Sequence, residues 1–439
     1  MNILHVISRY WPYVGGSERH LQEISERLVR EGHSVTVFTT DALDLELFWN
    51  RDKRRIAPYS EEHHGVRVYR FPVRHLPLPR IAFPGTRWAM TQLGRLPVDT
   101  APLLERLAPL APRVPDLQRA LDEIPGPLDM VHGMNICFES LLCPALHTAR
   151  RTGAAFIVTP LTHLGENERN QVRKYYTMPH QVALLQKADA VLAQTDIERE
   201  YLLAKGVPAA KIVKAGVGVN PSDIIGGDAS RFRSRFSIRK PFVFYLGTTA
   251  YDKGTFHLVQ AMGRLWDQGL DVDLVLAGPI MDGFSRFYAD VSPQHQERCH
   301  VLDVVPEEDK RDLLAAGSVM AMPSRTDSFG IVYLEAWLCG KPVIGALAGG
   351  VPEVIDDGED GFLVQFGDVE ALAGRLATLM MDQDLAGAMG ERGRQKVLTR
   401  YTWDHIYPVV RDTYQRLAPR RPAARVAASA SPQSSGRAS

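Results

Sequence analysis

Cysteine is scarce in this sequence, and long apolar runs and an excess of charge of one sign are absent. Only four cysteines occur in 439 residues, without C-x-x-C or other metal-ligand spacing, which excludes a disulfide scaffold. The 51 basic residues are balanced by 51 acidic ones, which argues against a nucleic-acid partner. No apolar run approaches the roughly 18 residues that a membrane-spanning helix needs, and the first residues do not resemble a signal peptide. We therefore expect a cytoplasmic protein that contacts a membrane at most peripherally.

Short apolar segments alternate with amphipathic segments along most of the chain. Strands are expected at 4–7 and 35–39, with a helix at 17–31 between them whose apolar residues recur every three or four positions. The alternation returns with strands at 242–246, 272–277, 319–322 and 342–346 and a helix at 331–339. Two separate sets of β-α alternation predict an α/β protein with two doubly wound, Rossmann-like domains.

Breaks in this pattern set the expected domain limits. The N-terminal domain should span 1–215, with an irregular basic insertion at about 65–127, and the C-terminal domain should span 216–400. Residues 65–98 contain six arginines and no acid, with aromatic residues between them. This composition fits either a solvated insertion or a surface for an acceptor or an anionic membrane. Residues 417–439 are rich in Arg, Ala, Ser and Pro, and we expect them to be disordered.

Glycine-rich and charged loops follow several of the predicted strands, where doubly wound folds bind their ligands. Paired glycines or a lysine before a helix can hold a phosphate, although each also occurs in ordinary turns and on solvated surfaces. Glu335 lies among apolar residues, where a carboxylate is costly unless it accepts hydrogen bonds, for example from the two hydroxyls of a ribose. These loops therefore indicate a nucleotide site.

The run from Ser324 to Asp368 resembles the nucleotide-sugar site of the large family of retaining glycosyltransferases with the GT-B fold. The matching motifs are Asp327-Ser-Phe-Gly-Ile-Val-Tyr-Leu-Glu335-Ala, Gly340-Lys-Pro-Val-Ile344 and Gly349-Gly-Val-Pro-Glu-Val-Ile355. With the amino-terminal Gly-Gly-Ser-Glu, the resemblance extends over roughly residues 1–415. It implies two Rossmann-like domains facing across a cleft and a helix at 401–416 that crosses back to the N-terminal domain. The implied reaction moves a sugar from a nucleotide-diphosphate donor to an acceptor with retention of configuration, without a metal or another cofactor.

The resemblance also implies roles for individual residues. Glu335 would hold the ribose of the donor, Lys253 would contact the diphosphate, and the loop containing Gly16 would close over the phosphates. The implied catalytic residues are Asp327, His163 and Lys253. The implied donor-binding residues are Glu335, Gly15, Gly16, Thr248, Phe329, Gly330, Ile331, Gly278 and Val305.

Two positions depart from the family pattern. Asp327 stands where the family usually has glutamate, so this carboxylate is one methylene shorter. Thr248 stands where the family usually has arginine, so one of two cations for the diphosphate is missing. Arg325 and Arg286 are candidate replacements.

Several alternatives remain open. The chain could be a non-catalytic relative that binds a nucleotide sugar or carbohydrate, or a sugar-nucleotide epimerase on the same fold. The acceptor could be a polysaccharide, a lipid-linked sugar or a small molecule. An NAD site is not expected because Gly216-Val-Gly218 lacks its third glycine. Asp271-Val-Asp273 flanks a strand start and His63-His64 lacks a second pair of ligands, so neither predicts a metal site.

Overall fold

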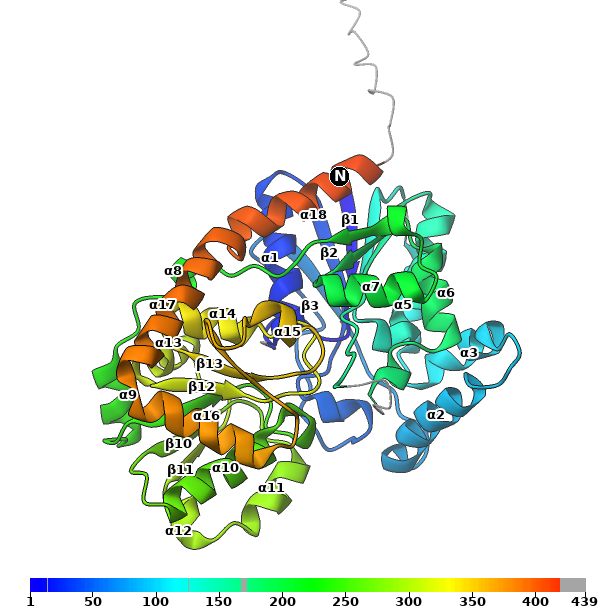
Figure 1. Cartoon of the computed structure of the whole chain (residues 1–439). Helices are drawn as coiled ribbons and strands as arrows, with labels where there is room; N and C mark the ends of the chain where they lie inside the picture. The colour runs from blue at the N-terminus through cyan, green and yellow to red at the C-terminus, as the bar shows by residue number, and fades with distance from the viewer. Residues whose placement is uncertain (14, 125, 167–171, 419–439) are drawn as a thin grey trace, which may run out of the picture.

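The structure of the chain is a computed structural model that describes residues 1–13, 15–124, 126–166 and 172–418. Two α/β domains lie side by side, each built on its own sheet (Figure 1). In the N-terminal domain the strands are β1 (Asn2–Val6), β2 (Ser34–Thr40), β3 (Ser60–His63), β4 (Val66–Phe71), β5 (Met130–Met134), β6 (Ala155–Thr159), β7 (Ala190–Ala193) and β8 (Ile212–Lys214). Its helices are α1 (Gly16–Arg30), α2 (Pro79–Leu93), α3 (Ala101–Leu107), α4 (Pro115–Glu123), α5 (Glu139–Thr152), α6 (Pro179–Lys187) and α7 (Asp196–Ala204).

The C-terminal domain repeats the same construction. Its strands are β9 (Phe242–Leu246), β10 (Asp273–Ala277), β11 (Cys299–Leu302), β12 (Val319–Met322), β13 (Val343–Ala346) and β14 (Gly361–Val364). Its helices are α8 (Pro221–Ile224), α9 (Ala229–Phe236), α10 (Thr255–Asp267), α11 (Asp282–Ala289), α12 (Pro293–Gln296), α13 (Glu307–Ala316), α14 (Ile331–Leu338), α15 (Val351–Val354), α16 (Val369–Met381) and α17 (Gln383–Arg400), and α18 (Trp403–Leu417) follows.

Both sheets are doubly wound. The first has the order β3-β4-β2-β1-β5-β6-β7-β8, in which only the edge strand β3 runs antiparallel to its neighbour. The second has the order β11-β10-β9-β12-β13-β14, and its neighbouring strands pair in parallel. Because helices cover both faces, the central strand β9 of the second sheet consists of apolar and aromatic residues that are all buried. The predicted fold class is confirmed, and the expected strands at 242–246 and 319–322 match β9 and β12 residue for residue.

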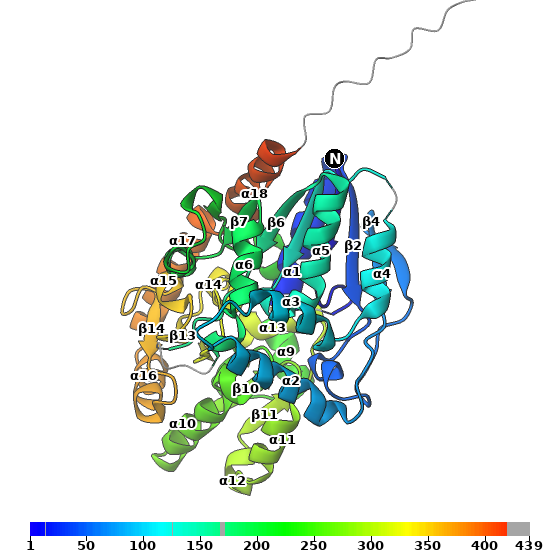
Figure 2. The ribbon, with the colours of Figure 1, turned by 90° about the vertical axis from the view of Figure 1, so that its right-hand side faces the viewer.

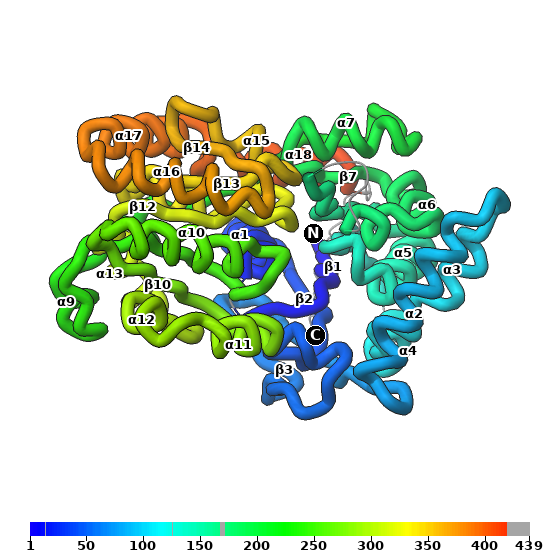
Figure 3. Tube along the Cα trace, turned by 60° about the horizontal axis from the view of Figure 1, so that its bottom comes forward, coloured from blue at the N-terminus to red at the C-terminus, as the bar shows by residue number. Residues whose placement is uncertain are grey.

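The segment 65–127 differs from the irregular insertion expected from its composition. It contains β4 and the helices α2, α3 and α4, and each of these helices has a proline in its first two positions. Proline fits there because its fixed φ suits the first turn, where its missing N–H group would have no helical partner. Pro79, Pro102 and Pro115 therefore begin helices, whereas Pro84 lies inside α2. Figures 1 and 3 show α2 and α3 at the outer edge of the N-terminal domain, and in Figure 2 this edge faces the viewer.

Two of the six arginines in 65–98 are buried and paired. These two therefore do not contribute to the cationic surface that the composition suggested. Arg70 pairs with Glu61 and donates to the carbonyl of Pro58 at 2.9 Å. Arg87 pairs with Glu139 and donates to the carbonyl of Tyr175 at 3.2 Å. A buried guanidinium needs such partners, so these two cations hold the fold together and are not offered to a ligand.

The last helix connects the two domains. After α17 on the C-terminal domain, α18 runs beside α1 and the amino terminus (Figure 1). Its apolar residues join the core of the N-terminal domain, with Trp403, Val410 and Tyr414 buried against side chains such as Leu21 and Ile24. The tail expected to be disordered lies outside the described residues beyond 418. No described helix is long and apolar enough to cross a membrane.

A buried polar network fixes α18 to the first sheet. The hydroxyl of Tyr414 lies 3.1 Å from Nε2 of His5 on β1 and 2.6 Å from Nδ1 of His132 on β5. His5 also contacts Ser25 at 2.8 Å, and His132 contacts Thr159 at 2.8 Å. All five side chains are buried, so every polar atom in this group depends on its neighbours.

We expect Tyr414→Phe to lower the free energy of unfolding by about 1–3 kcal/mol, because it leaves buried imidazole nitrogens without a partner. Urea unfolding followed by circular dichroism measures this loss. Tyr59→Phe is the matched control, since Tyr59 is exposed and should tolerate the same change. Equal unfolding midpoints for both variants would contradict the role of the network.

Candidate functional site

A cleft of about 770 Å³ lies between the two domains. It is lined by the loops after β1 and β2 of the first sheet and after β9, β10 and β11 of the second, together with α13 and α14. These loops leave the carboxyl ends of parallel strands, where ligand sites form in doubly wound folds. Seven of the predicted donor-binding residues line the cleft: Gly15, Gly16, Thr248, Gly278, Val305, Ile331 and Glu335.

Glu335 projects from the first turns of α14 and is 6% exposed. Its Oε1 pairs with Nζ of Lys310 from α13 at 2.7 Å, whereas Oε2 is buried and has no hydrogen-bond partner among the described residues. Burial works to lower the pKa of Lys310, but Glu335 and Glu307 outweigh it and raise that pKa. A buried carboxylate oxygen without a partner is costly, so this atom is suited to a ligand hydroxyl. The sequence analysis did not identify Lys310, because this residue belongs to no motif and lies 25 residues before Glu335.

The predicted catalytic residues form a second cluster next to the cleft. Nζ of Lys253 lies 3.1 Å from Oδ2 and 3.2 Å from Oδ1 of Asp327. Burial opposes ionisation of Asp327, but Lys253, Ser324 and His163 outweigh it and lower the pKa of the carboxyl. The sequence thus predicted residues that the fold brings together from three separate loops.

His163 is held as a neutral imidazole. Burial lowers its pKa to about 3, and nearby Lys253 acts in the same direction while Asp327 opposes the shift. Its Nδ1 lies 2.9 Å from the hydroxyl of Tyr176, whose pKa burial raises well above its ordinary value. A protonated phenol can donate to Nδ1, and the neutral ring then carries its proton on Nε2. In this tautomer His163 has a hydrogen-bond donor left for a sugar hydroxyl.

Phe329 and Gly330 shape the loop before α14. The Phe329 ring is buried and packs edge-on against Tyr401, at 5.5 Å between centroids, so its side chain is part of the core. Gly330 has φ +88°, and a Cβ there would lie 2.3 Å from Tyr333. Only glycine fits this position, which begins α14 and directs its N–H groups toward the site. Contact of their backbone amides with a sugar stays a prediction.

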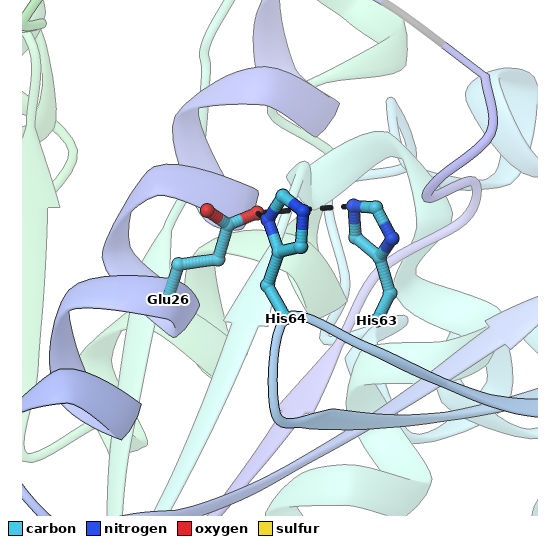
Figure 4. Close-up of side chains that lie close together, drawn as sticks. All are labelled: Glu26, His63 and His64. Carbon is cyan, nitrogen blue, oxygen red and sulfur yellow. Dashed lines mark ion pairs between the residues drawn. The ribbon is translucent and has the colours of Figure 1, made fainter.

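The structure adds Glu26 of α1 to the adjacent histidines of the β3–β4 hairpin (Figure 4). Glu26 Oε1 lies 3.1 Å from Nδ1 of His64 and 4.0 Å from Nε2 of His63. The two rings are stacked, with 4.1 Å between centroids and 19° between planes. Imidazole lone pairs lie in the ring plane, so those of two stacked rings run side by side and do not converge on one ion. The cluster is a stacked pair beside a carboxylate, and none of its residues lines the cleft.

Comparison with known families accounts for both halves of the chain. The model for a glycosyl transferase 4-like domain matches residues 15–218, and the model for glycosyl transferases group 1 matches residues 228–396. The chain belongs to this family of glycosyltransferases. The resemblance inferred from the motifs around Glu335 is confirmed.

Similar proteins include several bacterial glycosyltransferases. Alpha-maltose-1-phosphate synthase of Mycolicibacterium smegmatis is 29% identical over 53% of this chain and 65% of its own length. N-acetyl-alpha-D-glucosaminyl L-malate synthase of Bacillus anthracis is 35% identical over 35% of this chain and 42% of its own. The GDP-mannose-dependent alpha-(1-6)-phosphatidylinositol monomannoside mannosyltransferase of M. smegmatis is 27% identical over 91% of this chain and 95% of its own. The chain thus spans less than two thirds of the first two relatives.

Solved structures share the whole architecture. Sucrose-phosphate synthase from Thermosynechococcus elongatus has a TM-score of 0.71 at 21% identity and covers 95% of this chain and 98% of its own. HepE from Anabaena, in complex with UDP-glucose, has a TM-score of 0.68 at 19% identity and covers 95% and 100%. These likenesses show the GT-B fold.

We expect stability to fall as the pH falls from 7 to 5, because burial lowers the pKa of His163 and His5 to about 3 and that of His20 to about 4. Below about 6.5 the unfolded chain binds protons that these folded histidines do not, so each contributes a loss approaching 1.4 kcal/mol per pH unit. Urea unfolding at pH 7, 6 and 5 measures the slope. His163→Asn should make the slope shallower, and an unchanged slope in that variant would contradict a neutral His163.

Proposed function

We propose that this protein is a retaining glycosyltransferase that moves a sugar from a nucleotide-diphosphate donor to an acceptor without a metal ion. The observation that carries the proposal is the unpartnered Oε2 of Glu335 in the cleft, with the cluster of Lys253, Asp327 and His163 beside it. A ribose hydroxyl satisfies the first group, and a hexose joined to a diphosphate reaches the second. The family membership and the shared GT-B fold support the same reading.

In the proposed mechanism, the bond between the anomeric carbon and the diphosphate breaks while positive charge builds on the sugar. The leaving diphosphate gains negative charge, which Lys253 and the N-termini of α1 and α14 stabilise where it develops. His163 donates from Nε2 to a sugar hydroxyl and orients the ring. The acceptor hydroxyl attacks from the same face as the leaving group and passes its proton to a phosphate oxygen, which gives retention.

Glu335→Ala and Lys253→Ala should each lower kcat/KM for the donor by about 10- to 100-fold, because each removes charge-assisted hydrogen bonds. A panel of UDP-, GDP- and ADP-sugars identifies the donor by thermal shift, and nucleotide release then gives the rates. Asp382→Ala, an N-cap far from the cleft lining, serves as the control. Normal kinetics in Glu335→Ala would refute the site. Tight binding of a donor without transfer or hydrolysis would instead favour a non-catalytic binding protein, and an altered sugar on the nucleotide would favour an epimerase.

The acceptor side of the cleft is formed by the N-terminal domain. Relatives are named for acceptors as different as inositol phosphate and a phosphatidylinositol mannoside, so we propose a glycan, a lipid-linked sugar or a small molecule here. Nothing in the proposed reaction involves nucleic acid.

We also propose that the edge formed by α2 and α3 makes a peripheral contact with an anionic membrane. Large apolar side chains are exposed along it: Leu78 (72%), Ile81 (70%), Trp88 (58%), Leu96 (50%), Val98 (65%) and Leu103 (48%). Arg95 and Arg106 are exposed in the same segment and supply charge that complements acidic lipid headgroups. Apolar side chains flanked by arginine suit insertion at the headgroup boundary.

Ile81→Glu with Trp88→Glu should abolish flotation with vesicles containing phosphatidylglycerol, because both changes put negative charge into the contact. Vesicles of phosphatidylcholine alone should bind less of the unmodified protein. The exposed Met381 of α16 lies on the other domain, so Met381→Glu should leave flotation unchanged. Equal flotation of the double variant and the parent would rule out this surface.

A further inference from the structure

The C-terminal domain has fewer cations for a diphosphate than the family pattern supplies. Thr248 replaces the usual arginine, and Lys253 is already paired with Asp327. Neither expected replacement reaches the cleft. Arg325 donates from Nε to Asp252 at 2.7 Å and stacks on Phe366 at 4.7 Å, and exposed Arg286 is not among the residues that line the cavity.

Most other cations that line the cleft are committed to carboxylates of the protein. They pair as follows: Arg19 with Glu23 and Asp223, Lys53 with Glu46 and Asp282, Arg54 with Asp44, and Lys310 with Glu335. In each pair the charge of the cation is cancelled inside the site. A diphosphate would compete with a carboxylate for each of these cations, which weakens the contact that it could make.

Arg9 also pairs with a carboxylate, that of Glu18, but through a longer contact than these cations make. It follows β1 in the loop that leads to Gly15 and Gly16, and its side chain is only 12% exposed although it lines the cleft. Its Nε lies 3.3 Å from Glu18 Oε1 but is buried without a hydrogen bond in the part of the chain that the structure describes. The guanidinium carbon lies 3.7 Å from the centroid of the Tyr13 ring. A guanidinium held over an aromatic face can still donate from its edge to an anion.

The same loop reaches the position of the missing arginine. Tyr13, which carries Arg9 on its face, interacts with the side chain of Thr248 from the opposite domain, and all three residues line one cavity with Gly247. Gly16 touches this region too, since a Cβ there would lie 3.5 Å from Ile331 of α14. The guanidinium of Arg9 thus lies beside the N-terminus of α1 and across from the loop that lacks its cation.

We propose that Arg9, supplied by the N-terminal domain, contacts the donor diphosphate and replaces the cation lost at Thr248. This inference rests on the proposed function and adds a donor-binding residue that the motifs of the C-terminal domain do not contain. Because Arg9 and Lys253 belong to different domains, the diphosphate would bridge them and hold the two domains together over the donor. A planar guanidinium with several donors suits two phosphate oxygens at once.

The test measures binding of UDP, GDP, ADP, the matching nucleosides and inorganic pyrophosphate by calorimetry. Arg9→Ala should weaken the tightest nucleoside diphosphate and pyrophosphate by about 10- to 100-fold and leave the nucleoside unchanged. Adding Thr248→Arg to Arg9→Ala should restore most of the lost affinity, because it returns the cation to the opposite domain. Arg286→Ala should bind like the parent, and Arg9→Lys should fall between parent and Arg9→Ala.

The outcomes separate this inference from the function on which it rests. Parental affinity for the diphosphate in Arg9→Ala would overturn the role of Arg9 and leave the glycosyltransferase proposal standing. An equal loss for the nucleoside, without rescue by Thr248→Arg, would show that Arg9 only maintains the loop and would also overturn it. Failure of the parent protein to bind any nucleoside diphosphate would overturn the proposed function itself.

Discussion

Parallel pairing of the strands is the constraint on which the rest of this molecule depends. A parallel sheet needs a crossover after each strand, so every loop that leaves a carboxyl end emerges at the same edge. The two sheets face each other across one cleft, which collects Gly16, Thr248, Gly278 and Glu335 from distant parts of the chain. The helices that follow these loops have free N–H groups at their N-termini, an arrangement that suits an anionic ligand.

Charges within and beside the cleft are paired before any ligand arrives. Lys310 pairs with Glu335, and Lys253 pairs with Asp327, because an unpaired charge at such low exposure would be costly. Among the described residues that line the cleft, two buried side-chain atoms make no hydrogen bond: Oε2 of Glu335 and Nε of Arg9. A ligand that carries hydroxyls and phosphates at the right separation would satisfy them without breaking the pairs.

The N-terminal domain depends on the far end of the chain for its own packing. Tyr414 supplies the hydroxyl shared by His5 and His132, and Trp403 packs where the two domains meet and lines the cleft. The helix that carries both residues therefore ties the stability of the first sheet to the position of the second domain. The chain crosses between the domains near residues 215–220 and again just before α18. A change in the angle between the domains would therefore bend these two segments.

Local patterns predicted the regular parts of the fold. Short apolar runs predicted the strands β9 and β12. The spacing of Leu21, Ile24 and Leu28 predicted the helix α1. The segment 65–127 was misread as irregular because proline breaks an apolar period wherever it stands, and composition does not show whether it begins a helix. The buried ion pairs of Arg70 and Arg87 were missed for a related reason, since their partners lie in other elements.

The sequence by itself determined the two α/β domains, the family and the residues of the donor motifs, because all of these depend on short-range spacing. Only the tertiary structure decided that Lys310 pairs with Glu335, that Tyr176 contacts Nδ1 of His163, and that Arg9 and Thr248 line one cavity. Each of these contacts joins side chains from separate loops or helices. The spacing of residues along the chain does not predict these contacts, because they form where the carboxyl ends of the two sheets meet.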